Sequence, residues 1–108
     1  MALDIHIGKN EKEAERHLPV YSIELVIHET IFNRTSLPLN EMKLINRFKD
    51  YWSDCHFLPE ELPFLMKELS ILKNSFSQNS KVLRVLSGIY KACAKAQNAS
   101  EHIWFFCD

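Results

Sequence analysis

The sequence predicts an α+β domain, mostly helical, in which about four helices pack with a two-stranded sheet formed by the two ends of the chain. Ala2–Gly8 alternates apolar and polar residues, which is the pattern of a half-buried strand. His102–Asp108 holds a continuous apolar and aromatic run, as expected of a strand covered on both faces. A lone two-stranded pair is marginal in water, so we expect the two ends to pair and to pack on the helices. Residues 1–108 should then form one globular domain.

The first helix-like stretch after the N-terminal strand is ambiguous. In Tyr21–Asn33 every second residue from Tyr21 to Ile27 is apolar, which favours a strand. However, Ile23, Ile27 and Ile31 are four residues apart, as on one face of a helix. Ser22 before them is a good N-cap, and the stretch contains no Gly or Pro. We therefore predict a helix. The charged segment before it, Lys9–Pro19, is expected to be a solvated loop or a short frayed helix, with an exposed recognition loop as the alternative.

Three further helices are predicted. Asn40–Trp52 has Asn40 as a cap and an apolar stripe made by Leu44, Ile45, Phe48 and Trp52. A third helix begins at Pro59 and continues to about Phe76. Ser80 caps the last helix, Lys81–Gln97. The cost of a mid-helix Gly88 suggests a close crossing of a helix or strand there, with simple tolerance of the glycine as the alternative.

Composition sets limits on the partners. The chain has 108 residues and a formal net charge of −1, from 13 basic and 14 acidic residues. Lys and Arg are scattered along the sequence, which disfavours direct binding of DNA or RNA. No apolar run is long enough to span a bilayer, and no secretory signal is recognised. Three cysteines without a disulfide pattern suit a reducing compartment, so we expect a cytoplasmic protein with no membrane partner.

Catalytic motifs are weak. His28-Glu29 begins like the zinc motif H-E-x-x-H, but Phe32 occupies the position of the second histidine. We therefore interpret His28 and Glu24 as a polar pair on a helix surface. Cys55 and His56 are adjacent, and adjacent side chains usually diverge, so a thiol–imidazole pair is not expected.

Metal and cofactor sites are not predicted either. His6 and His102 could meet if the terminal strands pair, with Cys107 nearby, but polar strand residues are the commoner explanation. The chain has only two glycines, Gly8 and Gly88, which excludes the familiar glycine-rich phosphate loops.

Negative charge is concentrated around one loop. Asp50 and Asp54 precede Glu60 and Glu61, which stand at a helix start. A solvated loop is the common explanation of such a cluster. The alternative is a docking patch for a basic partner.

Several segments together resemble a family of small bacterial proteins. The chain resembles the CdiI-type immunity proteins of contact-dependent growth inhibition and related polymorphic-toxin systems over nearly its whole length. The segments that carry the resemblance are Leu3–Gly8, Tyr21–Phe32, Phe48–Trp52, Glu61–Pro63, Lys67–Leu69 and Leu83–Ala96 before the last strand.

The resemblance implies a non-enzymatic cytoplasmic protein that binds the C-terminal toxin domain of its cognate effector, often a nuclease, and blocks the active site. Such toxins tend to be basic around their active sites, so we expect partner-binding residues at Asp50, Asp54, Glu60 and Glu61. One alternative is a small cytoplasmic regulatory or adaptor domain that binds proteins through an apolar patch. Another is an enzyme of unrecognised chemistry, for which His28, Glu29, Cys55 and His56 are the visible material.

Overall fold

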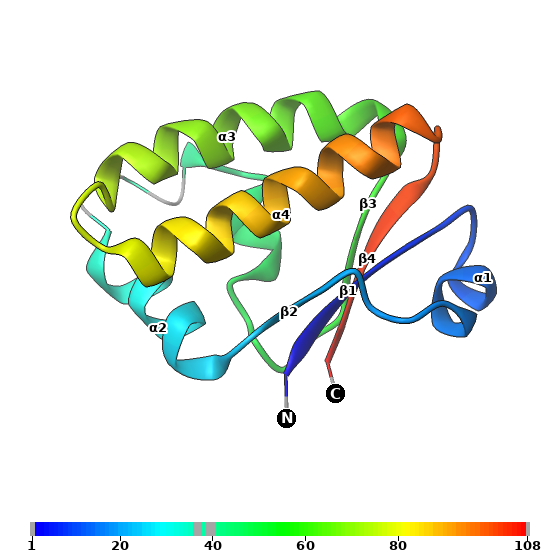
Figure 1. Cartoon of the computed structure of the whole chain (residues 1–108), viewed down its shortest axis with the longest axis horizontal. Coiled ribbons are helices and arrows are strands. Elements are labelled where there is room, and N and C mark those ends of the chain that lie inside the picture. Colours follow the sequence, from blue (N-terminus) through cyan, green and yellow to red (C-terminus); the bar gives the residue numbers. More distant parts are fainter. Residues whose placement is uncertain (1, 36–37, 39–40, 108) are drawn as a thin grey trace.

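The two ends of the chain pair at the centre of a four-stranded antiparallel sheet. In the computed structural model, which describes residues 2–35, 38 and 41–107, β1 (Leu3–Gly8) pairs along its length with β4 (His102–Cys107). β2 (Tyr21–Ile23) lies outside β1 and β3 (Cys55–Phe57) lies outside β4, so the strand order is β2-β1-β4-β3. Figure 1 shows the two termini side by side. The predicted pairing of the ends is confirmed, but the two-stranded sheet is wrong because two three-residue segments add an edge on each side.

The register of the sheet turns its aliphatic residues and Phe105 to one face. Ile5 pairs with Phe105, Ile7 pairs with Ile103, and all four are buried. The opposite face carries Trp104 and Phe106, which are partly exposed, and His6, which is 8% exposed. The alternation of β1 therefore separates a core face from an outer face, as its period of two requires.

Two long helices cover the core face. α3 (Leu62–Ser75) follows the short 3-10 helix η3 (Pro59–Glu61), and α4 (Ser80–Asn98) runs beside it across the sheet (Figure 1). These two helices match the predicted ones, but the side chain of Asn79, not Ser80, caps α4 by accepting the N–H of Val82 at 3.1 Å. Their inward residues are fully buried; they include Leu62, Leu65, Leu69, Leu72, Val82, Leu86, Ile89, Cys93 and Ala96.

The charged connector contains one short helix. α1 (Glu11–Arg16) is capped by Asn10, whose side-chain oxygen accepts the N–H of Glu13 at 2.9 Å. It packs closely on the end of β1, because a Cβ at Gly8 would lie 2.6 Å from the backbone nitrogen of Ala14. A glycine is therefore required there for the approach of α1.

The ambiguous stretch Tyr21–Asn33 forms a short strand followed by a helix. Tyr21–Ile23 forms β2 against β1, and α2 (Leu25–Arg34) begins directly after Glu24. A single helix from Tyr21 is therefore wrong at its start, because these three residues satisfy the open edge of β1. The pairing partner is distant in sequence, so local periodicity does not show it.

The predicted α-helix over Asn40–Trp52 is also wrong within the part that the structure describes. Asn40 lies outside the described residues, and residues 41–52 hold turns and the 3-10 helix η2 (Ile45–Phe48). An α-helix needs the N–H of Trp52 to bond to the carbonyl of Phe48. That N–H instead donates to Asp50 at 3.0 Å, and the carbonyl of Phe48 accepts from His28 at 2.6 Å. Both groups are therefore satisfied outside a helix.

Candidate functional site

Asp50 closes the turn that presents an exposed tryptophan. One oxygen of Asp50 accepts the backbone N–H of Trp52 at 3.0 Å, and the other accepts the hydroxyl of Ser53 at 2.8 Å. These two hydrogen bonds lower the pKa of Asp50. Trp52 leaves 55% of its surface exposed and meets the ring of Tyr51 edge-on at 5.2 Å. The turn therefore fixes the backbone at Trp52 and presents its ring at the surface beside a carboxylate.

A small cleft of about 220 Å³ lies next to this turn. Trp52 and Asp50 form part of its wall together with Lys49, and α2 contributes Leu25 and Glu29. Leu25 is itself 36% exposed. The surface around Trp52 thus combines apolar side chains with charges of both signs.

Two of the other acidic candidates, Asp54 and Glu61, have structural partners. Asp54 accepts the backbone N–H of Cys107 at 2.7 Å, which fixes the end of β4. Glu61 forms a two-pronged ion pair with Arg47, at 3.0 and 2.5 Å, and accepts the N–H of Leu58 at 2.9 Å. These contacts, the Arg47 hydrogen bond first, lower the pKa of Glu61.

The four acidic residues are not gathered into one patch. Asp54 precedes β3 and Glu60 follows it, so they lie beyond opposite ends of a strand about 10 Å long. Glu60 is exposed. Asp50 is the one of the four that shares a turn with an exposed aromatic side chain.

His28 is part of the interior. It is only 3% exposed, and its Nε2 donates to the carbonyl of Phe48 at 2.6 Å. Its ring packs on Phe32 and Tyr51 with centroids 4.6 and 5.0 Å apart. The predicted surface pair with Glu24 is wrong, because Glu24 precedes α2 and the imidazole points inward. Burial lowers the pKa of His28.

Cys55 and His56 point to opposite sides of β3. Cys55 pairs with Phe105 of the core face. Burial raises the pKa of the Cys55 thiol to about 12. His56 pairs with Trp104 of the outer face. The thiol is therefore protonated at neutral pH and turned away from the imidazole, so the two do not form a nucleophile and base.

His56 instead bonds to a second histidine. Its Nε2 lies 2.6 Å from Nδ1 of His102, and the two rings are parallel within 2°. The ring of His56 also stacks on Trp104 with centroids 3.8 Å apart. Burial, and then the charge of His102, lower the pKa of His56. Sequence reasoning missed this pair because strand β3 was not predicted.

His6 and His102 do not meet as the paired strands had suggested. In the register His6 is opposite Trp104 and His102 is opposite Gly8. Nδ1 of His6 donates to the carbonyls of Ala14 and His17, at 2.9 and 3.0 Å. No group of three metal-ligating side chains occurs within the described part of the chain.

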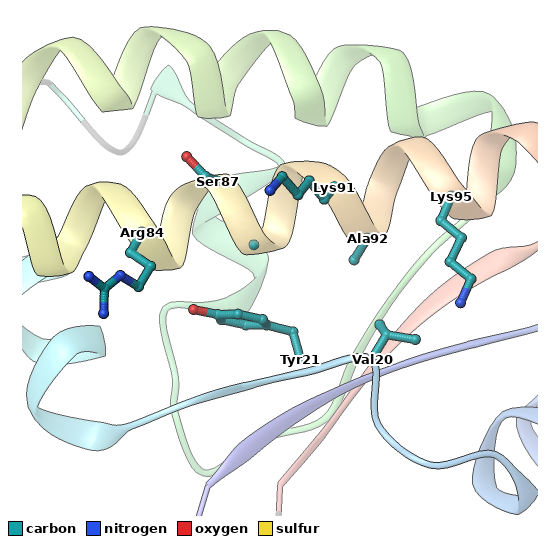
Figure 2. Close-up of a pocket in the computed structure, with 8 residues that line it drawn as sticks. Val20, Tyr21, Arg84, Ser87, Lys91, Ala92 and Lys95 are labelled. Carbon is teal, nitrogen blue, oxygen red and sulfur yellow. The ribbon is translucent and has the colours of Figure 1, made fainter.

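A groove beside α4 gathers basic side chains. Its larger lobe, about 380 Å³, lies between α4 and β2 and is drawn in Figure 2. Arg84, Lys91 and Lys95 line it from one face of the helix, and Val20 and Tyr21 line it from the strand side. A second lobe of about 340 Å³ shares Tyr21 and Arg84 and continues past Lys81, Glu24 and Val26.

The basic groove was missed because charges were counted along the sequence. The signal was present in α4, where Lys81, Arg84, Lys91 and Lys95 follow one another at three, seven and four residues with no acidic residue in the helix. That spacing places all four on one face. Within residues 2–35, 38 and 41–107 the ion pair found is that of Arg47 with Glu61, so these cations are unpaired.

Comparisons with known proteins give no family. No family model, no curated protein and no solved structure matches this chain. Among the described residues, no helix is long and apolar enough to cross a membrane.

Proposed function

We propose that this protein is a non-enzymatic cytoplasmic immunity protein, which binds a cognate toxin domain and blocks its active site. The observation that carries the proposal is the Trp52 side chain, 55% exposed on a turn closed by two hydrogen bonds to Asp50. Buried aromatic anchors contribute much of the binding energy at protein interfaces. Because the backbone at the anchor is already fixed by Asp50, it does not have to be ordered on binding, which favours affinity.

The charges around Trp52 suit a toxin with a basic active site, such as a nuclease. Asp50 stands beside the anchor, and Asp54, Glu60 and Glu61 are proposed as the remaining partner-binding residues. Charge complementarity would speed the encounter and orient it. Lys49 lies in the same wall, and the net charge of the chain is only −1. A mixed polar and apolar interface is therefore proposed, rather than an acidic surface that imitates nucleic acid.

A regulatory or adaptor domain is the second candidate. Phe64 and Ile71 on α3 are 65% and 44% exposed, and seven residues apart they lie on one face of the helix. Such a face could bind a partner protein or a second copy. It differs from the Trp52 surface, so substitutions separate the two candidates.

The test is co-expression with the toxin domain encoded beside this gene. We expect the wild-type chain to rescue growth and to co-purify with the toxin domain at one to one. Trp52→Ala should weaken the complex by at least about 2 kcal/mol, roughly thirtyfold, as for an interface hot spot. Phe64→Ala is the matched control, an equally exposed aromatic whose loss should leave affinity within about twofold.

Three outcomes would contradict the proposal. A neighbouring effector that is not neutralised, or the lack of any secreted effector beside the gene, would remove its basis. Loss of binding in Phe64→Ala with retention in Trp52→Ala would favour the adaptor candidate and the surface of α3.

A further inference from the structure

The groove between α4 and β2 concentrates the positive charge of an otherwise acidic chain. Four of the 13 basic residues lie on α4, which has no acidic residue. The rest of the chain carries 13 − 4 = 9 basic and 14 acidic residues, a balance of −5. The expectation that nucleic acid would not bind assumed scattered cations, and that premise does not hold for α4.

The side chains that line the groove form an ordered row. Lys81 and Lys95 are fourteen residues apart, which corresponds to about 21 Å along a helix. Arg84 and Lys91 lie between them, and all four are exposed. Glu24 is the acidic residue that lines the second lobe, so the lining side chains carry 4 − 1 = 3 positive charges.

Tyr21 lies at the junction of the two lobes. Its ring rests against the helix backbone at Gly88, where a Cβ would lie 2.4 Å from a ring carbon. In Figure 2 the ring lies under α4 with its hydroxyl directed toward the Arg84 end of the groove. Tyr21 and Arg84 line both lobes, so a ligand that fills both must pass them.

We propose that this groove binds single-stranded nucleic acid through its phosphodiester backbone. Lobes of about 380 and 340 Å³ are at the small end of ligand sites, which range from roughly 300 to 1,000 Å³. Two adjoining lobes of that size suit successive nucleotides, and the row of cations follows the repeated charge of the chain. Lobes of this volume suit single nucleotides, so we expect a single strand to bind more tightly than a duplex. This site is distinct from the Trp52 surface and does not depend on the immunity proposal.

The charge of a phosphodiester chain distinguishes it from most acidic protein segments. Such a chain presents a charge at every residue whatever its sequence, so it can pair with four cations spread unevenly over about 21 Å of helix. An acidic protein segment does so only where its sequence places several carboxylates in a row. Val20 and Tyr21 add apolar surface beside the cations, as grooves for single strands do.

The test is fluorescence anisotropy with labelled ten-nucleotide oligo-U and oligo-dT on the purified full chain, from 50 to 200 mM NaCl. Four phosphate contacts should give a slope of about −3 in log K against log salt, from about −0.7 for each contact. The variant with Arg84, Lys91 and Lys95 all changed to Gln should bind at least tenfold more weakly at 50 mM and show a slope near −1.

The matched control removes three exposed lysines elsewhere, Lys12, Lys43 and Lys67, each changed to Gln. It should keep affinity within about threefold and a slope near −3. Both variants change only exposed side chains, and a thermal melt checks that each folds. Binding of oligo-U and oligo-dT alike supports recognition through the backbone, whereas binding of one alone shows readout of the sugar or base and overturns it.

Other results would also overturn the proposal. If neither oligonucleotide binds the wild-type chain at 50 mM NaCl, the proposal is wrong. An equal loss of affinity in the control variant would show general electrostatic attraction and no defined binding site. A ten-base-pair duplex that binds as tightly as the single strands contradicts the groove argument. Equal competition by poly-glutamate of matched charge would assign the groove to an acidic protein instead.

Discussion

At the scale of single residues, Gly88 and Tyr21 show how one contact sets the identity of a residue. A mid-helix glycine costs about 1 kcal/mol relative to alanine. A Cβ at Gly88 would lie 2.4, 2.6 and 2.8 Å from three atoms of the Tyr21 ring. The helix therefore gives up intrinsic stability so that Tyr21 can pack on its backbone and β2 can approach.

Gly88→Ala should accordingly have opposite effects in two backgrounds. In the wild type the ring must move, and we expect a net loss of about 1 kcal/mol in the free energy of unfolding. In a Tyr21→Ala background the same change should stabilise the fold by up to about 1 kcal/mol through helix propensity. Urea denaturation of the four proteins gives the coupling energy, expected near 2 kcal/mol. A coupling energy near zero would show that the ring does not constrain residue 88.

One of the two residues in this contact, Gly88, could be identified from the sequence. The cost of a mid-helix glycine predicted a close crossing at Gly88, and that prediction is confirmed. The partner could not be predicted, because Tyr21 is distant in sequence and was assigned to a helix. His28 shows the same limit: its neighbours in the sequence suggested a surface pair, whereas its partner Phe48 belongs to another element.

At the scale of elements, the predictions succeeded where a segment is stabilised by its own pattern. α3 and α4 carry long apolar stripes, and both were predicted nearly to their ends. β2 and β3 have three residues each and depend on pairing with β1 and β4. Such short strands carry no periodic signal of their own, so the sheet was predicted with two strands.

The candidate site was predictable to a similar degree. Asp50 was selected for its charge, but its hydrogen bonds to the Trp52 turn depend on the chain leaving a helical path after Phe48. Trp52 is predicted in the apolar stripe of a helix, but its side chain is 55% exposed. The row of cations on α4 was visible in the sequence, but only the position of β2 makes it the wall of a groove.

The imidazole of His28 connects α2 to Phe48 at the end of η2, and this connection should depend on pH. Burial lowers the pKa of His28 in the folded protein, whereas in the unfolded chain it titrates near 6.5. Below that pH the unfolded state binds more protons than the folded state, so unfolding is favoured as pH falls. The contribution is fully present above about pH 7 and is lost as pH falls through 6.5 toward the folded value. His56, whose pKa is also lowered, acts in the same direction.

His28→Gln should reduce this dependence. The amide can still donate to the carbonyl of Phe48, but it does not titrate. Between pH 7.5 and 5 we expect the free energy of unfolding to fall less in the variant than in the wild type, by about 1.4 kcal/mol for each unit by which the pKa is lowered. Urea denaturation across this range measures the difference. Parallel curves for the two proteins would contradict a buried, neutral His28.

At the scale of the whole molecule, two surfaces of different chemistry share one core. The Trp52 surface is built on turns between α2, η2 and β3, and the cationic groove is built on α4 and β2. Their residues do not overlap, so a protein partner and a nucleic acid could be tested one at a time. Failure of either proposal leaves the other intact.

The core that supports both surfaces converges on β4, which is central in the sheet. Phe105 is fully buried, lies parallel to Phe48 at 4.8 Å, and meets Phe57 at 5.7 Å. It thereby joins β4 to η2 and β3. Its neighbour Phe106 points to the outer face, where it is partly exposed and lies near His6.

These two adjacent phenylalanines provide a matched pair of substitutions. Phe105→Ala removes a ring from the interior and should cost about 3–5 kcal/mol, a large part of the 5–15 kcal/mol that holds a domain of this kind folded. Phe106→Ala should cost about 1 kcal/mol, because its ring is partly solvated already. Urea denaturation monitored by circular dichroism measures both. Equal losses would mean that the two faces of β4 are equally buried, which contradicts the register with β1; a difference of at least 2 kcal/mol agrees with a sheet that has one core face.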